Sequence, residues 1–342
     1  MRKGPTINDV ARAASVSSMT VSRVINGHAY IRTATRQRVE AAIAALGYQP
    51  NSLAQGMRTN TTRAIGFMLP DITNSTNAAV AQAAERVLVK RGFRLLLGST
   101  GFDVELEAQC LNAFQQRTVD GVVAVLADET SEKIHSLLRA SRVPIVVIDR
   151  DLPFAIDTVW SEHKPAMREV VRYLTGLGHR RIGLVMSPVT MRPGRHRVDA
   201  FIQTMRELSL EPDPSLIRWE RQLVEDGYRA ALDLLRRSPP PTALVVGANQ
   251  QTFGALQAIR ELGLKVPQDL SFIGADENLA ASLIEPPLTM IWRDMALMGQ
   301  HAATLLLERL GQAPRTDVRT ITVTSEVILR QSCAPPKKAS SS

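Results

Sequence analysis

From Ala64 onwards, short apolar runs alternate with longer stretches in which apolar residues recur at helical spacing. Such runs are typical of buried parallel strands that are joined by crossover helices. The pattern therefore predicts an α/β fold, and it contains too many strands for one small lobe. The predicted strands are AIGFML (64–69), FRLLLG (93–98), GVVAVLA (121–127), PIVVID (144–149), RIGLVM (181–186), TALVVGA (242–248) and LSFIGA (270–275).

The same pattern predicts where the chain passes from one lobe to another. A break near 159–161 and crossings near 289–293 and 320–324 indicate two α/β lobes of related architecture. The last run, TITVTSEVIL (320–329), alternates between apolar and polar residues, which favours an edge strand. Helices are expected between the strands, among them 77–91, 104–116, 165–177, 197–208 and 250–262.

Residues 1–49 follow a different pattern, with short helical stretches and tight connections. Thr6 stands three residues before Asp9, which resembles a capping box at the start of a helix. Ser17 can cap a second helix, and Gly47 can end a third. Only residues 15–17 separate the first two helices, so these must cross steeply. This arrangement is a helix-turn-helix.

Charge is unevenly distributed along the chain. Residues 1–63 hold nine Lys and Arg against two acidic residues, whereas the rest of the chain holds 32 and 31. A basic segment joined to a nearly neutral body is typical of a nucleic-acid-binding module. A solvated basic face would give the same counts, so charge alone leaves both interpretations open.

Composition narrows the class of protein. The chain has 342 residues, of which 44% are hydrophobic and 22% charged, as expected of a globular protein with two or three domains. No apolar run is long enough for a membrane span, and residues 1–5 lack the apolar core of a secretory leader, so we expect a cytoplasmic protein. Two cysteines, Cys110 and Cys333, and six scattered histidines predict neither disulfides nor a metal site. GLGHRRIG (176–183) precedes a strand and lacks phosphate-loop spacing, so we expect no cofactor, no catalytic residues and no enzyme.

The stretches TINDVARAASVSSMTVSRVING (6–27) and VEAAIAALGYQPNSLAQGMRTNTTRAIG (39–66) resemble the lac repressor/gal repressor (LacI/GalR) family of bacterial transcription regulators. The resemblance extends to about residue 332. It implies an α/β protein in which an N-terminal three-helix helix-turn-helix domain and a hinge helix precede a two-lobed, periplasmic-binding-protein-like body with parallel sheets. The implied boundaries are 1–49 for the DNA-binding domain, 50–63 for the hinge helix and linker, 64–332 for the effector-binding and dimerisation body, and 333–342 for a disordered tail. Lobe 1 is expected at about 64–160 and 293–320, and lobe 2 at about 161–290 and 321–332.

The resemblance also implies which residues contact DNA. The family reads bases from the start of the second helix, and those positions correspond to Ser18, Met19 and Arg23. An Arg can bond to guanine and a Met can contact a thymine methyl in the major groove. The family's phosphate contacts correspond to Thr6, Ser17, Thr20, Ser22, Asn26 and Thr35.

The segment YQPNSLAQGMR (48–58) is a candidate hinge. A helix this short is not stable alone in water, and Gly56 weakens it further. Without the resemblance the segment would be a plain linker. The family implies a helix that orders on DNA, with contacts at Asn51 and Ala54 and with Met57 as a wedge in the minor groove.

Candidate effector contacts follow from the rule that parallel α/β lobes bind ligands at the carboxyl ends of their strands. Each candidate could instead be a turn residue or part of an ion pair. The rule and the resemblance together nominate Asn74, Asp149, Arg195, Arg197, Asn249, Asp276 and Arg293.

Three departures from the family pattern affect this cleft. Asn74-Ser75-Thr76-Asn77 replaces a loop that commonly carries aromatic residues, Ala248-Asn249 lacks one carboxylate of an Asn-Asp pair, and Arg293 replaces Gln. The cleft thereby loses stacking surface and gains positive charge. Because Arg binds carboxylates and phosphates bidentately, we expect an anionic effector, such as a sugar acid or sugar phosphate, between Arg197 and Arg293. Asp149 and Asp276 would bind its hydroxyls.

The sequence therefore predicts a homodimeric transcriptional repressor that a small anionic metabolite releases from a palindromic double-stranded DNA operator. The tail has no leucine heptad, so we expect a dimer and not a tetramer. Two alternatives stay open. One is a regulator whose ligand strengthens operator binding, and the other is a two-lobed solute-binding protein.

Overall fold

The computed structural model describes residues 5–25, 30–48, 61–116, 119–276, 279–311 and 317–337. The chain divides into two units, Met1–Thr62 and Arg63–Ser342, and each has its own apolar core. Across the described ranges, no helix combines the length and apolar character needed to cross a bilayer.

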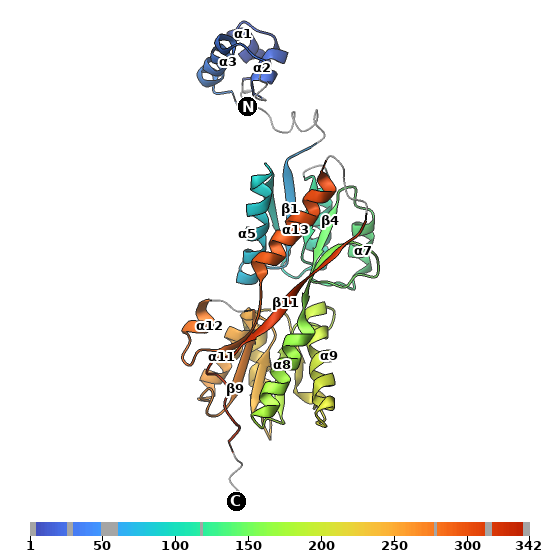
Figure 1. The fold of residues 1–342 in the computed structure, drawn as a ribbon, viewed down its shortest axis with the longest axis vertical. Coiled ribbons are helices and arrows are strands. Elements are labelled where there is room, and N and C mark those ends of the chain that lie inside the picture. The colour runs from blue at the N-terminus through green and yellow to red at the C-terminus, as the bar shows by residue number, and fades with distance from the viewer. Residues whose placement is uncertain are drawn as a thin grey trace, which may run out of the picture. The chain divides into compact units, whose positions relative to one another are not determined.

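The first unit is a three-helix domain (Figure 1). The predicted capping box is present, because the Asp9 N–H donates to Thr6 Oγ1 (3.4 Å) and the Thr6 N–H donates to Asp9 Oδ2 (2.8 Å). Ser17 Oγ accepts from the Thr20 N–H (3.2 Å), and Gly47 ends the third helix with φ 60°. These caps confirm the predicted helix-turn-helix. Its helices are α1 (Ile7–Ala13), α2 (Ser18–Ile25) and α3 (Thr33–Leu46), packed on Val10, Ala11, Ala14, Val21, Val24, Val39 and Ala42.

Lobe 1 of the second unit is a parallel sheet between two helical layers (Figure 1). Its strands lie in the order β2-β1-β3-β4-β5. Helices α5 and α13 cover one face, and α6 and α7 cover the other. The elements are β1 (Ala64–Leu69), α5 (Ser75–Lys90), β2 (Arg94–Ser99), α6 (Val104–Gln115), β3 (Gly121–Ala124), α7 (Glu132–Arg139), β4 (Ile145–Ile148), β5 (Asp157–Glu162) and α13 (Met295–Leu310).

Lobe 2 repeats this architecture with the strand order β10-β9-β8-β6-β7. Helices α8 and α9 pack on one face, and α10 and α11 pack on the other. The elements are α8 (His163–Gly176), β6 (Ile182–Met186), α9 (Arg192–Glu207), a 3-10 turn (Pro214–Leu216), β7 (Ile217–Trp219), α10 (Val224–Leu235), β8 (Ala243–Val246), α11 (Asn249–Glu261), β9 (Ser271–Ala275), α12 (Leu279–Leu283) and β10 (Thr289–Arg293).

Both faces of each sheet are buried at the central strands, such as β1, β3, β4, β6, β8 and β9, which explains why these strands read as continuous apolar runs. In β1, Phe67 and Leu69 point to the α5 and α13 side, whereas Met68 joins the core under α6 and α7. All seven strands named from the sequence are present, which confirms the predicted α/β class. The short strands β5 and β7 lack a long apolar run, and their positions were not predicted.

Strand β11 (Thr320–Ile328) joins the two lobes and runs between them in Figure 1. Residues 320–324 pair in parallel with β5, and residues 325–328 pair antiparallel with β10. Each half of β11 forms the edge of one lobe's sheet, as the alternating pattern predicts. Because the first half pairs with β5 and the second half pairs with β10, the strand as a whole has one partner on each side. The last crossing falls between Thr324 and Ser325, a few residues beyond the predicted boundary.

The segment Cys333–Lys337 differs from the expected disordered tail. The Ala334 N–H donates to Ser271 Oγ (3.0 Å), and its carbonyl oxygen lies 2.9 Å from Nε2 of the buried His179. Lys337 pairs with Asp269. These contacts hold the segment against lobe 2, because polar groups at the amino ends of the strands need partners. Residues 338–342 lie outside the described ranges.

Candidate functional site

The second helix of the first unit presents the residues that the sequence assigned to base reading. Val21 and Val24 are buried on one side of α2, which leaves Ser18, Met19 and Arg23 exposed on the other. Met19 is 63% exposed, so its side chain is available for contact with a partner. The face is small, polar and basic, as a surface that enters a DNA groove must be.

Among the predicted phosphate contacts, Thr6 and Ser17 are exposed, whereas Thr20, Ser22 and Thr35 are half-buried. Ser17 Oγ and Thr20 Oγ1 lie 3.0 Å apart beside the start of α2. A helix start with hydroxyl groups suits a phosphate oxygen. The predicted contacts Asn26, Asn51, Ala54 and Met57 lie outside the described residues.

The second candidate site lies between the two lobes, where two aspartates hold equivalent places. Asp149 follows β4 and Asp276 follows β9, each at the carboxyl end of its strand. Both have left-handed backbones, with φ 56° and 59°, a conformation that Asp tolerates better than most residues. Both side chains are buried. The two lobes thus direct one carboxylate each into the same space.

Arg293, the last residue of β10, binds both carboxylates. Its Nε lies 2.7 Å from Asp276 Oδ1, and its Nη1 lies 2.6 Å from Asp149 Oδ2. Nη1 also donates to Ser161 Oγ (2.9 Å). Burial disfavours the charged guanidinium, but the two carboxylates outweigh it and raise the pKa of Arg293. The interaction is therefore a buried ion pair that spans both lobes.

Asp149 has further partners in His163 and Arg192. His163 Nε2 lies 2.9 Å from Asp149 Oδ2, and Arg192 Nη1 lies 3.3 Å from Oδ1. Burial opposes ionisation of Asp149, but His163, Arg293 and Arg192 together hold its pKa well below the ordinary value. Burial lowers the pKa of His163 to about 3, so its ring is neutral at pH 7 although Asp149 favours the charged form.

Arg197 is the largest fully buried side chain. Its Nη1 donates to the Gly247 carbonyl (2.5 Å), and its Nη2 is 3.7 Å from Asp276 Oδ1. Within the described part of the chain, its Nε and Nη2 have no hydrogen-bond acceptor. Buried donors are seldom left without an acceptor, so this guanidinium can donate a hydrogen bond to one more oxygen atom.

One side of the cleft is closed by ion pairs, which we call the charged rim: Glu129 and Asp151 of lobe 1 with Arg192 and Arg195 of lobe 2. Arg195 Nη2 lies 2.5 Å from Glu129 Oε1 and 2.9 Å from Asp151 Oδ2. Arg192 Nε lies 2.9 Å from Asp151 Oδ1, and its backbone N–H donates to Glu129 Oε2 (3.0 Å). Burial opposes ionisation of Asp151, but His196 and the two arginines lower its pKa to about 2.

The other side is closed mainly by side-chain amides, which we call the amide rim. Asn249 of lobe 2 donates to Asn74 Oδ1 (3.0 Å) and Ser75 Oγ (2.9 Å) of lobe 1. Gln250 donates to Asp71 Oδ2 (2.9 Å). Asn74 also caps α5 by accepting from the Thr76 N–H. Asn74 and Asn249, both predicted as effector contacts, therefore meet each other across the cleft.

Two expectations about the cleft need correction. The helix predicted at 197–208 begins earlier, because α9 starts at Arg192, with Pro193 in its first turn, and it therefore holds both Arg195 and Arg197. Gly194 permits this early start, because a Cβ there would lie 2.2 Å from the Ser187 carbonyl oxygen. Arg197 and Arg293 also do not come from different lobes, because β10 belongs to the sheet of lobe 2.

The structure also shows the partners of the two aspartates. Their predicted role in binding ligand hydroxyls stays a prediction, and in the structure both are paired with Arg293 and its neighbours. The reason is the buried Arg293 itself, because a guanidinium at this position needs carboxylate partners.

The cavity between the lobes is about 40 Å³, room for a few water molecules. It is lined by polar side chains that the sequence did not single out as a set. Arg150 directly follows Asp149 after the end of β4, and Gln222 follows the unpredicted strand β7. The polar lining residues are Asn74, Thr76, Asn77, Asp149, Arg150, Gln222, Asp276 and Arg293.

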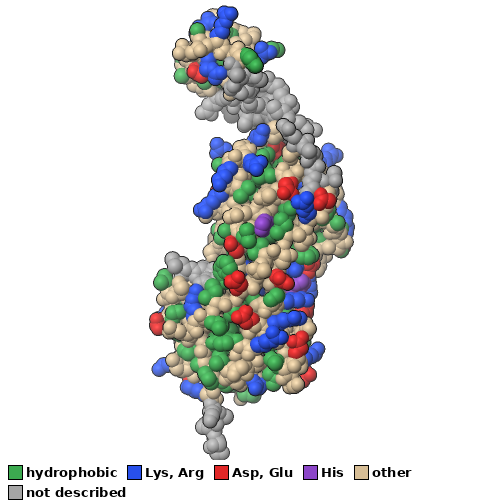
Figure 2. All heavy atoms as spheres, viewed as in Figure 1, with side chains coloured by type: hydrophobic (Ala, Val, Ile, Leu, Met, Phe, Trp, Pro, Cys, Tyr) green, Lys and Arg blue, Asp and Glu red, His purple; other side chains and the backbone are tan. Residues whose placement is uncertain are grey.

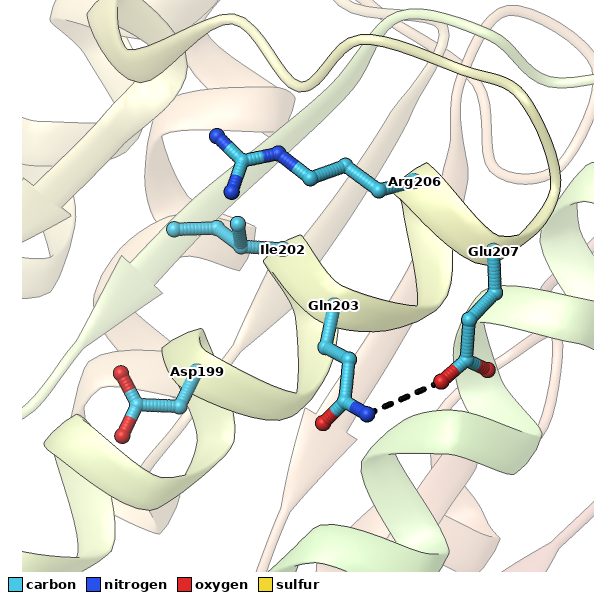
Figure 3. A pocket seen from close by; sticks show the side chains of 5 residues that line it. All are labelled: Asp199, Ile202, Gln203, Arg206 and Glu207. Carbon is cyan, nitrogen blue, oxygen red and sulfur yellow. Dashed lines mark hydrogen bonds between the residues drawn. The ribbon is translucent and has the colours of Figure 1, made fainter.

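A shallow hollow also lies on the outer surface of α9, lined by Asp199, Ile202, Gln203, Arg206 and Glu207 (Figure 3). Gln203 Nε2 donates to Glu207 Oε1 (3.0 Å). All five side chains come from one helix and carry charges of both signs. They do not converge on one point, so we assign no ligand to this surface.

Comparison with known proteins places both sites in one family. The family described as bacterial regulatory proteins, lacI family, matches residues 6–51, and the periplasmic binding protein-like domain matches residues 171–333. The HTH-type transcriptional repressor PurR of Klebsiella pneumoniae subsp. pneumoniae is 32% identical over 343 residues, covering 96% of this chain and 97% of the relative. PurR of Escherichia coli O1:K1 / APEC is 33% identical over 342 residues, with the same coverage.

Solved structures agree with this placement. The lac repressor dimer bound to operator and the anti-inducer ONPF is 26% identical, with a TM-score of 0.85 over 97% of this chain and 100% of that one. The complex of the transcriptional regulator CelR with cellobiose is also 26% identical, with a TM-score of 0.73 over 96% and 99%. This chain therefore belongs to the LacI family of bacterial regulatory proteins and is a DNA-binding transcriptional repressor, not an enzyme.

Proposed function

We propose that the protein represses transcription as a homodimer on a palindromic operator and is released by a small anionic metabolite, such as a sugar acid or sugar phosphate. The first unit supplies base reading through Ser18, Met19 and Arg23. The cleft between the lobes supplies ligand binding. Family membership supports the DNA-binding part, and the charges of the cleft support the ligand part.

The ligand proposal is carried by buried Arg197, whose Nε and Nη2 have no hydrogen-bond acceptor among the described residues, Nη2 being 3.7 Å from Asp276 Oδ1. Arg150 and Arg192 are also buried nearby, although Arg192 is already paired with Asp149 and Asp151. His163 adds no charge at pH 7. An anion would supply the acceptors that Arg197 lacks. Ligand hydroxyls would then be bound by neutral groups such as Asn74 and Gln222, because both aspartates are paired.

The dimer proposal rests on the free edge of lobe 1. Strand β2 ends the sheet, and its Leu96 and Leu97 are 41% and 49% exposed. An edge strand that shows apolar side chains is usually covered by a partner. A second copy on this edge would give the two-fold symmetry that a palindromic operator requires.

Repression would be relieved when ligand binding changes the angle between the lobes and hence the spacing of the two DNA-binding units. The ligand can shift this equilibrium only by its difference in affinity for the two states. A ligand that prefers the DNA-bound state would strengthen repression instead. Operator binding measured with and without ligand distinguishes the two signs.

Calorimetry of the full chain against neutral sugars, sugar acids and sugar phosphates tests the ligand class. We expect binding of an acid or a phosphate, and at least tenfold weaker binding to Arg197→Met, because a desolvated charge contact of this kind contributes about 1.5–3 kcal/mol. Tight binding of a neutral sugar by both proteins would overturn the proposal.

Selection from random DNA tests base reading, because exchange of Ser18 and Met19 should change the selected consensus.

A further inference from the structure

We infer that the turn Lys90–Arg94 of lobe 1 is a second DNA contact, which binds backbone phosphates in the duplex flanking the operator. This inference rests on the proposed operator binding by the first unit. It assigns to the body a contact that reads no sequence and adds affinity through charge alone.

The turn carries three basic side chains on a fixed scaffold. Lys90 is the last residue of α5, Arg91 is its C-cap and Arg94 begins β2, and all three are exposed. Gly92 makes the turn tight, with φ 78°, and Phe93 packs against the core under α5. The charges are therefore presented from a rigid turn, and Figure 2 shows Lys and Arg side chains gathered over this end of lobe 1.

Among the described residues these charges lack acidic partners, whereas several other basic residues of the same lobe are paired. Arg309 pairs with Asp157, and Arg319 pairs with Asp317 and Glu308. Among the described residues, no carboxylate pairs with Lys90, Arg91 or Arg94. Since the chain beyond residue 63 is nearly neutral, with 32 basic and 31 acidic residues, an unbalanced group of three is a local excess.

The turn also lies where the chain enters the body. Arg63 immediately precedes β1, and its carbonyl oxygen accepts from the Arg94 N–H (2.8 Å). The Arg63 guanidinium lies over the Phe93 ring, 5.3 Å from its centre. DNA that is held by the first unit is thus tethered to the body beside this turn. A polyanion brought to this point by the tether matches the unpaired charges.

The test uses the full chain and two duplexes that contain the same operator, obtained by selection from random DNA. One duplex ends at the operator, and the other extends it by about 15 base pairs on each side, enough for more than one helical turn. Binding is measured across a salt series for the wild type and for Lys90→Gln/Arg91→Gln/Arg94→Gln. Thermal unfolding of both proteins checks that the fold is kept, because Lys90 and Arg91 also favour the carboxyl end of α5.

We expect the triple variant to bind the long duplex at least tenfold more weakly, with a salt slope smaller by about 1 to 5, since each lost phosphate contact removes about 0.9 and a homodimer carries two such turns. Its binding to the short duplex should not change. A matched control, Arg206→Gln/Arg260→Gln/Lys265→Gln, removes the same charge from exposed positions of lobe 2 and should bind both duplexes as the wild type does.

Equal binding of the long duplex by the wild type and the triple variant would overturn the inference, as would equal losses on both duplexes or the same loss in the control. Failure of the proposed function looks different, because then selection yields no operator and the wild type binds neither duplex specifically.

Discussion

The two rims of the cleft bring the same pair of lobes together through different chemistry. The charged rim joins Glu129 and Asp151 to Arg192 and Arg195, and the Glu129 side chain there is only 2% exposed. The amide rim joins Asn249 and Gln250 to the loop after β1 through bonds that mostly carry no net charge. Charge-assisted bonds are about twice as strong as neutral ones, and a buried charge without its partner is costly.

This difference predicts that the two sides of the cleft do not open equally. The amide rim loses little when water replaces its partners, because exposed amides form equivalent bonds to water. Opening at the charged rim must separate the buried Glu129 carboxylate from the Arg195 guanidinium and from the Arg192 N–H. Opening of the lobes should therefore begin at the amide rim, while the charged rim stays closed and serves as the hinge.

The largest effect is expected for Glu129→Gln. The change removes the charge that binds Arg195, while an amide oxygen remains for the Arg192 N–H, so we expect a loss of about 2–3 kcal/mol, less than for a fully buried pair because Arg195 is partly exposed. Urea unfolding measures the loss, and small-angle scattering should show a more open body. Stability within about 0.5 kcal/mol of wild type, the size of an ordinary surface effect, would show that the charged rim does not hold the lobes.

A smaller effect is expected for Asn249→Ala. Two hydrogen bonds to Asn74 and Ser75 are lost. Ser75 is exposed and can bond to water instead, whereas Asn74 is buried, so we expect a loss of about 1–2 kcal/mol. Scattering should nevertheless show opening, because this rim is expected to yield first. Gln203→Ala on the outer surface of α9 serves as the control, since it removes an exposed amide that bonds to Glu207 and joins no lobes.

A fall in pH is expected to weaken the charged rim, because Asp151 becomes protonated. The pKa of Asp151 is lowered to about 2, so its contribution is present above its unfolded value near 4 and is lost as the pH falls towards 2. After allowance for partial exposure, the loss is on the order of 1 kcal/mol. Asp151→Asn should remove this part of the pH dependence between pH 4 and pH 2. An unchanged acid limb in that variant would assign the dependence to another carboxylate.

The smallest effect is expected from salt. Exposed ion pairs weaken when salt screens them, but Glu129 is buried and should be shielded from the solvent ions. Raising NaCl from about 0.1 to 1 M should change the Glu129→Gln loss by less than about 0.5 kcal/mol. A loss that disappears in high salt would identify the charged rim as an ordinary surface interaction.

Short-range sequence signals predicted the fold well. The capping box at Thr6, the cap at Ser17 and the stop at Gly47 depend on residues within a few positions of each other, and all three are confirmed. The seven apolar strands are confirmed for the same reason. The start of α9 was predicted too late. The sequence pattern does not show that the backbone at Gly194 packs closely against the Ser187 carbonyl, a contact that only glycine allows.

The cleft was harder to predict, because its chemistry depends on partners far apart in the sequence. The rule on strand ends correctly indicated that Asp149, Asp276 and Arg293 lie together. It could not show that Arg293 neutralises both aspartates, since this pairing is decided by the packing of β10 against β9 and β11. The dense charges of Asp149-Arg150-Asp151 and of Arg192 to Arg197 were the available signal for the charged rim.

Strand β11 gives the body a mechanical property. Thr324 is the last residue bonded into one sheet and Ser325 is the first bonded into the other, so no slack chain separates them. An extended strand resists stretching but twists readily about its own axis. The two lobes can therefore rotate against each other about this strand, which keeps them from sliding past each other. A change in the contacts between the lobes is thereby expressed as a change in the angle between them.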